Sequence, residues 1–205
     1  MHNTTLDHIV ISAPDLLSGA RHVETALGVP MGAGGAHEVM GTHNQLLSLG
    51  ATDYLEVIAV DARAPNPKRP RWYGLDDFAG APRLTNWALR VEDLDKALEL
   101  APAGAGAPLQ VTRGSNRWRL SVPEEGQMPW DGLFPALIEW ETPCPAPNLP
   151  DQGARLHSFT LSHPEAGTLS TALAPFLADD RVSLRQGPIG ITAEISTESG
   201  LKTLR

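Results

Sequence analysis

With 205 residues, the chain is long enough to bury one large hydrophobic core or two small ones. Its formal net charge of -8 gives it no electrostatic footprint for nucleic acid or for an anionic membrane surface, so we expect neither as a partner. The single cysteine, Cys144, excludes an intrachain disulfide, and the first residues have neither the basic segment nor the apolar run of a signal peptide. We therefore expect a cytoplasmic protein.

The first elements along the chain are predicted to be a strand and a helix. Residues 6–12, LDHIVIS, alternate in polarity and are rich in β-branched side chains, as in a strand. Asp15 is placed to cap a helix, and Gly28 is placed to end it. Three further strands are then predicted: 32–44, where the glycines require a loop or bulge, and 45–49 and 54–60, which form a hairpin around GATD.

A long loop follows at residues 61–83, rich in proline and arginine. Loops of this length inside a compact domain are usually functional or disordered, and the aromatic side chains here argue against disorder. Arg71 could recognise a carboxylate or phosphate, and Trp72 offers a flat apolar wall, so both are candidate substrate contacts. The alternative is a loop that its own aromatic side chains anchor.

After this loop the pattern restarts. The string LDHIVISAPDL (6–16) aligns with LTNWALRVEDL (84–94), and YLEVIAV and LIEWET each carry a glutamate, Glu56 and Glu139. The pattern predicts two βαβββ modules, about 4–62 and 83–142, in a domain spanning 1–148. A proline-rich linker precedes a third, partial βαββ unit at 154–205, which we expect to pack on that domain.

Two polar residues stand in the middle of apolar rows. His8 lies between Leu6 and Val10 on one strand face, and Glu56 lies between Tyr54 and Ile58 on another. A buried histidine or carboxylate without a partner is costly, so the two are expected to meet each other, a metal ion or water. A hydrogen-bonded pair and a set of divalent-metal ligands are both consistent with the sequence.

Two further histidines are candidate substrate contacts. His37 follows two glycines, which allow the backbone to approach a ligand closely, although a surface position on a bulged strand is an alternative. His43 would share a strand face with Leu47, and a tight hairpin would pair Leu47 with Glu56. Asn44 would then point away from the site and be structural.

The strings LDHIVISAPDL, GGAHEVMGTHNQLLSLG and YLEVIAVD, with PRWYGLDDF and FPALIEWETP further on, resemble glyoxalase-like proteins of the vicinal oxygen chelate superfamily. The resemblance implies an α+β fold whose repeated βαβββ modules form a cup-shaped, incompletely closed mixed sheet. It implies that His8 and Glu56 are metal ligands. The second module has Asn86 where a histidine is expected, and Glu139 would be a third ligand or a general base.

The resemblance favours an enzyme that uses a divalent ion (Zn, Fe, Mn or Ni) to act on a small oxygen-bearing metabolite, as an isomerase, lyase or dioxygenase. The alternative is a metal-free protein that binds or sequesters a small molecule, which the Asn86 departure favours. In either case Asn86 is a candidate substrate contact, and a homodimer is compatible with the sequence. We expect His8, Glu56 and Glu139 to share the floor of one cavity, with the loop at 61–83 at its border.

Overall fold

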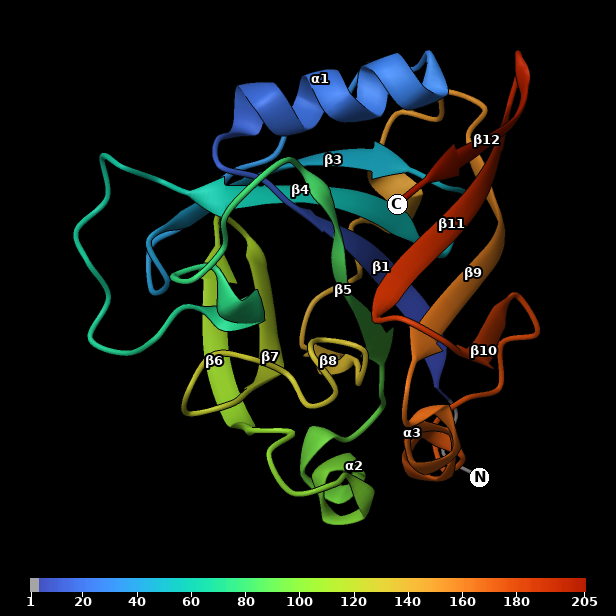
Figure 1. The fold of residues 1–205 in the computed structure, drawn as a ribbon. Helices are drawn as coiled ribbons and strands as arrows, with labels where there is room; N and C mark the ends of the chain where they lie inside the picture. The colour runs from blue at the N-terminus through green and yellow to red at the C-terminus, as the bar shows by residue number, and fades with distance from the viewer. Residues whose placement is uncertain (1–3) are drawn as a thin grey trace.

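The computed structural model describes residues 4–205 and contains two β-sheets and three α-helices in that range (Figure 1). The larger sheet has eight strands in the spatial order β2 (Ala36–His37), β3 (Thr42–Ser48), β4 (Tyr54–Val60), β1 (Thr5–Ser12), β5 (Arg83–Arg90), β8 (Ala136–Trp140), β7 (Asn116–Val122) and β6 (Ala107–Arg113). This order confirms the expected curled mixed sheet.

The larger sheet consists of two similar halves. In the first half β1 pairs with β4 in parallel, and in the second half β5 pairs with β8 in parallel. The halves join where β1 and β5 run antiparallel, so each half is a βαβββ unit. The outer strands β2 and β6 do not pair with each other, which leaves one seam in a nearly closed sheet.

Helix α1 (Leu16–Leu27) lies across the first half of the sheet (Figure 1). Its ends are as expected: the Asp15 side chain accepts a hydrogen bond from the Ser18 amide at 2.8 Å, and Gly28 closes the helix with a φ of 72°. Helix α2 (Leu94–Leu100) is the counterpart in the second half. Within residues 4–205, no helix has both the length and the apolar character needed to cross a membrane.

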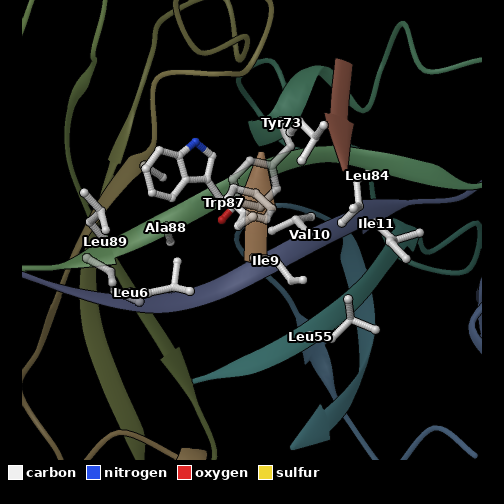
Figure 2. Close-up of a cluster of buried hydrophobic side chains, with 14 of the residues drawn as sticks. Leu6, Ile9, Val10, Ile11, Leu55, Tyr73, Leu84, Trp87, Ala88 and Leu89 are labelled. Carbon is white, nitrogen blue, oxygen red and sulfur yellow. The ribbon is translucent and has the colours of Figure 1, made fainter. Parts of the chain in front are cut away.

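The smaller sheet belongs to the carboxyl-terminal part of the chain. Its strands lie in the order β10 (Val182–Gln186), β9 (Arg155–His163), β11 (Gly190–Thr197) and β12 (Gly200–Leu204), and α3 (Ala166–Leu173) connects β9 to β10. The sequence did not lead us to expect β12. The two sheets share a core, in which Trp87 of β5 lies 5.5 Å from Phe159 of β9 between ring centroids. Figure 2 shows Trp87 and Tyr73 among the buried side chains of β1 and β5.

Two details of strand pairing determine where the polar side chains point. Along β1, Leu6 pairs with Leu89 and His8 with Ala88, so Asp7 is an extra residue, a β-bulge. In the β3–β4 hairpin, Glu56 pairs with Leu46. The expected partner was Leu47. Because side chains alternate along a strand, this one-residue difference exchanges the two faces of β3.

Candidate functional site

The bulge at Asp7 brings its carboxylate beside the neighbouring imidazole. Asp7 Oδ1 lies 2.7 Å from His8 Nδ1, and Asp7 Oδ2 accepts hydrogen bonds from Arg90 Nε at 2.8 Å and Trp140 Nε1 at 3.0 Å. Burial alone would raise the pKa of Asp7, but His8 and Arg90 lower it below its ordinary value. Asp7 is therefore ionised and accepts the Nδ1 proton of His8, which directs Nε2 into the cavity.

Glu56 faces His8 from the adjacent strand β4. Its Oε2 lies 3.5 Å from His8 Nε2, and its Oε1 accepts a hydrogen bond from Asn44 Nδ2 at 2.6 Å. Asn44 Oδ1 in turn accepts from the Gly35 amide and from Arg113 Nη1, both at 2.9 Å. These acceptor contacts fix which end of the amide is oxygen, so the group that faces Glu56 is a donor.

His37 lies next to this network but is occupied differently. Its Nδ1 is 3.1 Å from Thr42 Oγ1, and its Nε2 is 3.3 Å from Arg113 Nη1. Burial, followed by the charge of Arg113, lowers the pKa of His37 to about 3. At neutral pH the ring is uncharged, with Nε2 accepting from Arg113 and Nδ1 donating to Thr42. His37 lines the cavity as a positioning group for Arg113.

Arg113 closes the seam of the sheet. It stands at the end of β6 and reaches His37 on β2 and Asn44 on β3, across the gap between the two edge strands. Both of these bonds come from Nη1. The guanidinium has three further N–H donors, one on Nε and two on Nη2, so Arg113 can also contact an anion in the cavity. No local pattern in the sequence indicated this role, because an arginine at a strand end is usually solvated.

The segment before β5 covers the cavity. Trp72 and Tyr73 lie in a short 3-10 helix, η1 (Trp72–Gly74), and both line the cavity with buried rings. The hydroxyl of Tyr73 is 3.4 Å from His8 Nε2, and burial raises the pKa of Tyr73 well above 10, so the phenol stays neutral. The neighbouring Arg71 points elsewhere: it bonds to Asp76, at 2.5 Å from Nη1, and does not line the cavity.

The enclosed space between these side chains is small, about 30 Å³. That is room for about two water molecules. The lining combines the polar network with aromatic and aliphatic side chains: His8, His37, Asn44, Tyr54, Glu56, Trp72, Tyr73, Arg113, Trp118, Leu120, Ile138 and Trp140. A substrate therefore requires movement of at least one covering side chain.

Two expected members of the site lie elsewhere. His43 is on the opposite face of β3, where its Nδ1 lies 3.9 Å from Asp61 Oδ2. The hairpin register places Asn44, and not His43, on the face that Glu56 occupies. Glu139 points out of the cavity, where it accepts hydrogen bonds from the Leu94 amide at 2.8 Å and Arg119 Nη2 at 2.5 Å. It thus anchors the start of α2, and the expected shared floor of His8, Glu56 and Glu139 does not form.

The sheet register explains the position of Glu139. Glu56 pairs with Val10, two residues after His8. In the second unit the residue two positions after Asn86 is Ala88, and it pairs with Ala136. The structural counterpart of Glu56 is therefore Ala136. Asn86 does not line the His8–Glu56 cavity and lies in a separate one.

A curled sheet built from two facing βαβββ units, with polar side chains of one unit on its inner face, defines the vicinal oxygen chelate fold. The chain belongs to the glyoxalase-like domain family, whose model matches residues 6–177. No curated protein matches this chain at a significant level.

Solved structures share the fold at low identity. A hypothetical protein from Staphylococcus aureus is similar over 98% of both chains, with 14% identity and a TM-score of 0.63. Methylmalonyl-CoA epimerase from Mycobacterium tuberculosis has 19% identity over 66% of this chain and 85% of its own, with a TM-score of 0.42. The Streptomyces coelicolor methylmalonyl-CoA epimerase in complex with 2-nitronate-propionyl-CoA has 18% identity over 67% and 97%, with a TM-score of 0.44. At this identity, the similarity to the Staphylococcus aureus protein supports the fold and nothing about activity.

The donor set can be tested against the divalent metal that the resemblance implies. His8 Nε2 and Glu56 Oε2 face each other across the cavity, and each is held by a neighbouring side chain, as the ligands of a metal often are. Catalytic zinc sites use about three protein ligands. Among residues 4–205 no group of three or more His, Cys, Asp or Glu side chains is arranged to hold a metal ion, and the amide of Asn44 presents a donor. The cavity therefore does not supply the donor set of a resident metal.

Proposed function

We propose that the protein is an enzyme that transfers a proton on a small, oxygen-bearing anionic metabolite, as an isomerase or lyase does. The observation that carries the proposal is the approach of His8 Nε2 and Glu56 Oε2 to 3.5 Å on the lining of a small cavity. Each is held from behind, His8 by Asp7 and Glu56 by Asn44. Two titratable groups fixed in this way favour acid–base chemistry over a purely structural pair.

The roles follow from the hydrogen bonds. Glu56 is the base that removes a proton from a carbon next to a carbonyl group. His8, protonated at Nε2, donates to the carbonyl oxygen as negative charge develops there, and the Asp7 carboxylate balances the charge of the ring. Arg113 binds the carboxylate of the substrate through the donors that His37 and Asn44 do not use.

Solvent isotope exchange tests this proposal even though the natural substrate is unidentified. Small 2-oxo and 2-hydroxy acids, beginning with pyruvate, are incubated with the protein in D₂O, and proton NMR follows the loss of C–H signals next to the carbonyl. Glu56→Gln should slow exchange by about 10²-fold or more, since a positioned base contributes about that factor. His43→Gln and Glu38→Gln, which change residues outside the cavity, should leave exchange unchanged. Exchange that Glu56→Gln does not slow would refute the assignment.

A second candidate is a protein that binds a small molecule without transforming it. The aromatic lining favours it, because Tyr54, Trp72, Trp118 and Trp140 offer apolar faces around the polar pair. Saturable binding of a panel member, seen as quenching of tryptophan fluorescence, with no isotope exchange at any pH between 6 and 9 would favour this candidate.

The divalent metal expected from the resemblance has no part in this proposal, because the described residues of the cavity offer it only two ligands. His8 and Glu56 are the residues that would hold it, and it would supply Lewis-acid stabilisation of a negatively charged oxygen. No step of the proposed proton transfer depends on it.

A further inference from the structure

A second cavity, of about 350 Å³, lies on the far side of Tyr73 from His8 and Glu56. The start of β5 forms one wall, and the start of β11, from the carboxyl-terminal sheet, forms another. The lining residues are Tyr73, Gly74, Asp77, Phe78, Arg83, Leu84, Thr85, Asn86, Gln127, Asp131, Leu133, Ile189, Gly190 and Ile191. The larger cavity thus lies where the two sheets meet, and the carboxyl-terminal unit contributes to it.

Asn86, on the lining of this cavity, carries an unsatisfied hydrogen-bond acceptor. Asn86 is 1% exposed, and its Oδ1 has no hydrogen-bond partner among the described residues. Its Nδ2 donates to the Gly132 carbonyl at 3.5 Å, which fixes the orientation of the amide, because a flipped amide would set two oxygens against each other. Buried polar atoms are nearly always paired in folded proteins, so Asn86 Oδ1 indicates a ligand or a water with a donor group.

Tyr73 is on the lining of both cavities and is therefore the residue that they share. Its backbone has a φ of 59°, in the left-handed region that a bulky residue rarely adopts. Such conformations concentrate at functional sites, where the surrounding structure holds them. Its hydroxyl makes only a long contact, 3.4 Å, with His8 Nε2. A ring held in this way can turn aside with little loss of hydrogen bonding.

The charges around the larger cavity restrict what it accepts. The guanidinium of Arg83 bonds to the carbonyls of Ala79 and Ala81 and lies 4.5 Å from the Phe78 ring centroid. Two carboxylates, Asp77 and Asp131, are on the same lining. Two carboxylates against one guanidinium give the lining a net negative charge, so the cavity disfavours a phosphate group and favours an uncharged one.

We propose that the two cavities are one substrate site and that Tyr73 separates them until substrate binds. The proposal rests on the proton-transfer function: the reacting carboxylate end occupies the His8–Glu56 side, and the larger cavity takes an uncharged tail. That tail carries a hydroxyl or amide N–H group, which donates to Asn86 Oδ1, and an apolar portion, which contacts Phe78 and Ile189. The net negative charge of the lining disfavours a phosphorylated tail.

NMR titration of the side-chain amide of Asn86 tests the tail site alone. N-methylacetamide and erythritol serve as uncharged probes, and glycerol 3-phosphate serves as the charged probe. The uncharged probes should shift the Asn86 signal saturably, and the phosphate should bind at least 10-fold more weakly. Ile189→Trp should block the mouth of the cavity, because Ile189 is 53% exposed on its lining. Leu201→Trp is the matched control, being 54% exposed on β12 and absent from the lining. Equal binding of all three probes, or binding that Ile189→Trp does not weaken, would overturn the proposal.

Exchange kinetics link the tail site to catalysis. Asn86→Leu and Ile189→Trp should each raise the KM for 2-oxo acids with a hydroxylated chain at least 10-fold more than they raise the KM for pyruvate, and Leu201→Trp should not change the ratio of the two KM values. If exchange depends on Glu56 but neither variant changes the ratio of the KM for the hydroxylated acids to the KM for pyruvate, the tail-site proposal is wrong and the proposed function stands. If the probes bind as expected but Glu56→Gln leaves exchange unaffected, the proposed function fails and the tail site stands.

Discussion

Asn44 donates a hydrogen bond to Glu56 at 2.6 Å while both of its amide ends are engaged, since its oxygen accepts from Gly35 and Arg113. The orientation of the Glu56 carboxylate on β4 is therefore determined by a chain of contacts through Asn44 on β3 to Arg113 on β6 and to Gly35, just before β2. Asn44 is 4% exposed, so water does not substitute for it. We treat it as the positioning residue of the candidate base.

The first prediction follows from this contact. Asn44→Ala removes the donor of a buried carboxylate and the acceptor of the Gly35 amide, and each unsatisfied buried group costs about 1–3 kcal/mol. We expect the free energy of unfolding in urea to fall by at least about 2 kcal/mol. Gln45→Ala, at the neighbouring position on the other face of β3, should cost less than about 0.5 kcal/mol. Equal losses in the two variants would contradict the role given to Asn44.

A second prediction concerns Gly34, which lies against the backbone of Asn44. A Cβ atom at position 34 would stand 2.0 Å from the Asn44 carbonyl oxygen, a distance that no packing tolerates. Gly34→Ala should therefore destabilise the protein by more than about 2 kcal/mol and displace Asn44 from Glu56. Gly167→Ala is the control, because nothing lies within 4 Å of its added Cβ in α3, and alanine should stabilise that helix by up to about 1 kcal/mol. Thermal unfolding of both variants measures the contrast.

The sequence predicts the scaffold better than the site, for reasons that particular residues illustrate. The caps of α1 and the duplicated βαβββ pattern depend on local chemistry. Asp15, Gly28 and the aligned strings were therefore sufficient to predict the ends of the helix and the two units of the sheet. The partner of His8 was missed because a bulge turns Asp7 to the same side, and a regular strand would separate adjacent residues. Likewise, a difference of one residue in the hairpin register exchanged His43 for Asn44.

Residues that meet only through the tertiary fold left no trace in the local pattern. Arg113 acts across the seam between β6 and β2, which are distant in sequence and lie at opposite ends of the strand order. Glu139 matched Glu56 in the alignment of strings, but the register aligns Glu56 with Ala136. Strand register depends on loop geometry and on packing over the whole sheet, so a glutamate in the right strand did not establish which face it occupies.

The third prediction is a dependence of stability on pH that His37 causes. Its pKa is lowered to about 3 in the folded protein, from 6.5 in an unfolded chain. Between these values the unfolded state binds a proton that the folded state does not, so stability falls as pH drops below about 6.5. The loss approaches about 1.4 kcal/mol per pH unit for this one group. His37→Gln should reduce that slope between pH 6 and pH 4, as measured by urea unfolding at each pH.

The control for His37 is His43, because no comparable burial surrounds it and its side chain is 23% exposed. His43→Gln should preserve most of the slope. If the two variants lose the slope equally, the pH dependence between pH 6 and pH 4 does not originate in the burial of His37, and Asp7 does not account for it either. The lowered pKa of Asp7 contributes stability that is fully present above about pH 4 and is lost only at lower pH. His37 and Asp7 therefore affect the free energy of unfolding in different pH ranges.

The last prediction concerns divalent metal. His8 and Glu56 offer two ligands, Asn44 presents a donor to the carboxylate, and Glu139 points away from the cavity. With so few ligands, zinc, manganese or nickel should bind weakly. A tight site would be easy to detect, because metal at about 100 times its Kd would raise the free energy of unfolding by about 2.7 kcal/mol. We expect instead that added metal raises the thermal midpoint of the wild-type protein and of Glu56→Gln by the same small amount. The comparison with Glu56→Gln removes the contribution of surface histidines and of Cys144. If the tag-free wild-type protein retains one equivalent of metal and Glu56→Gln retains none, the ion belongs to the site and the metal-free mechanism must be replaced by the metal-dependent one.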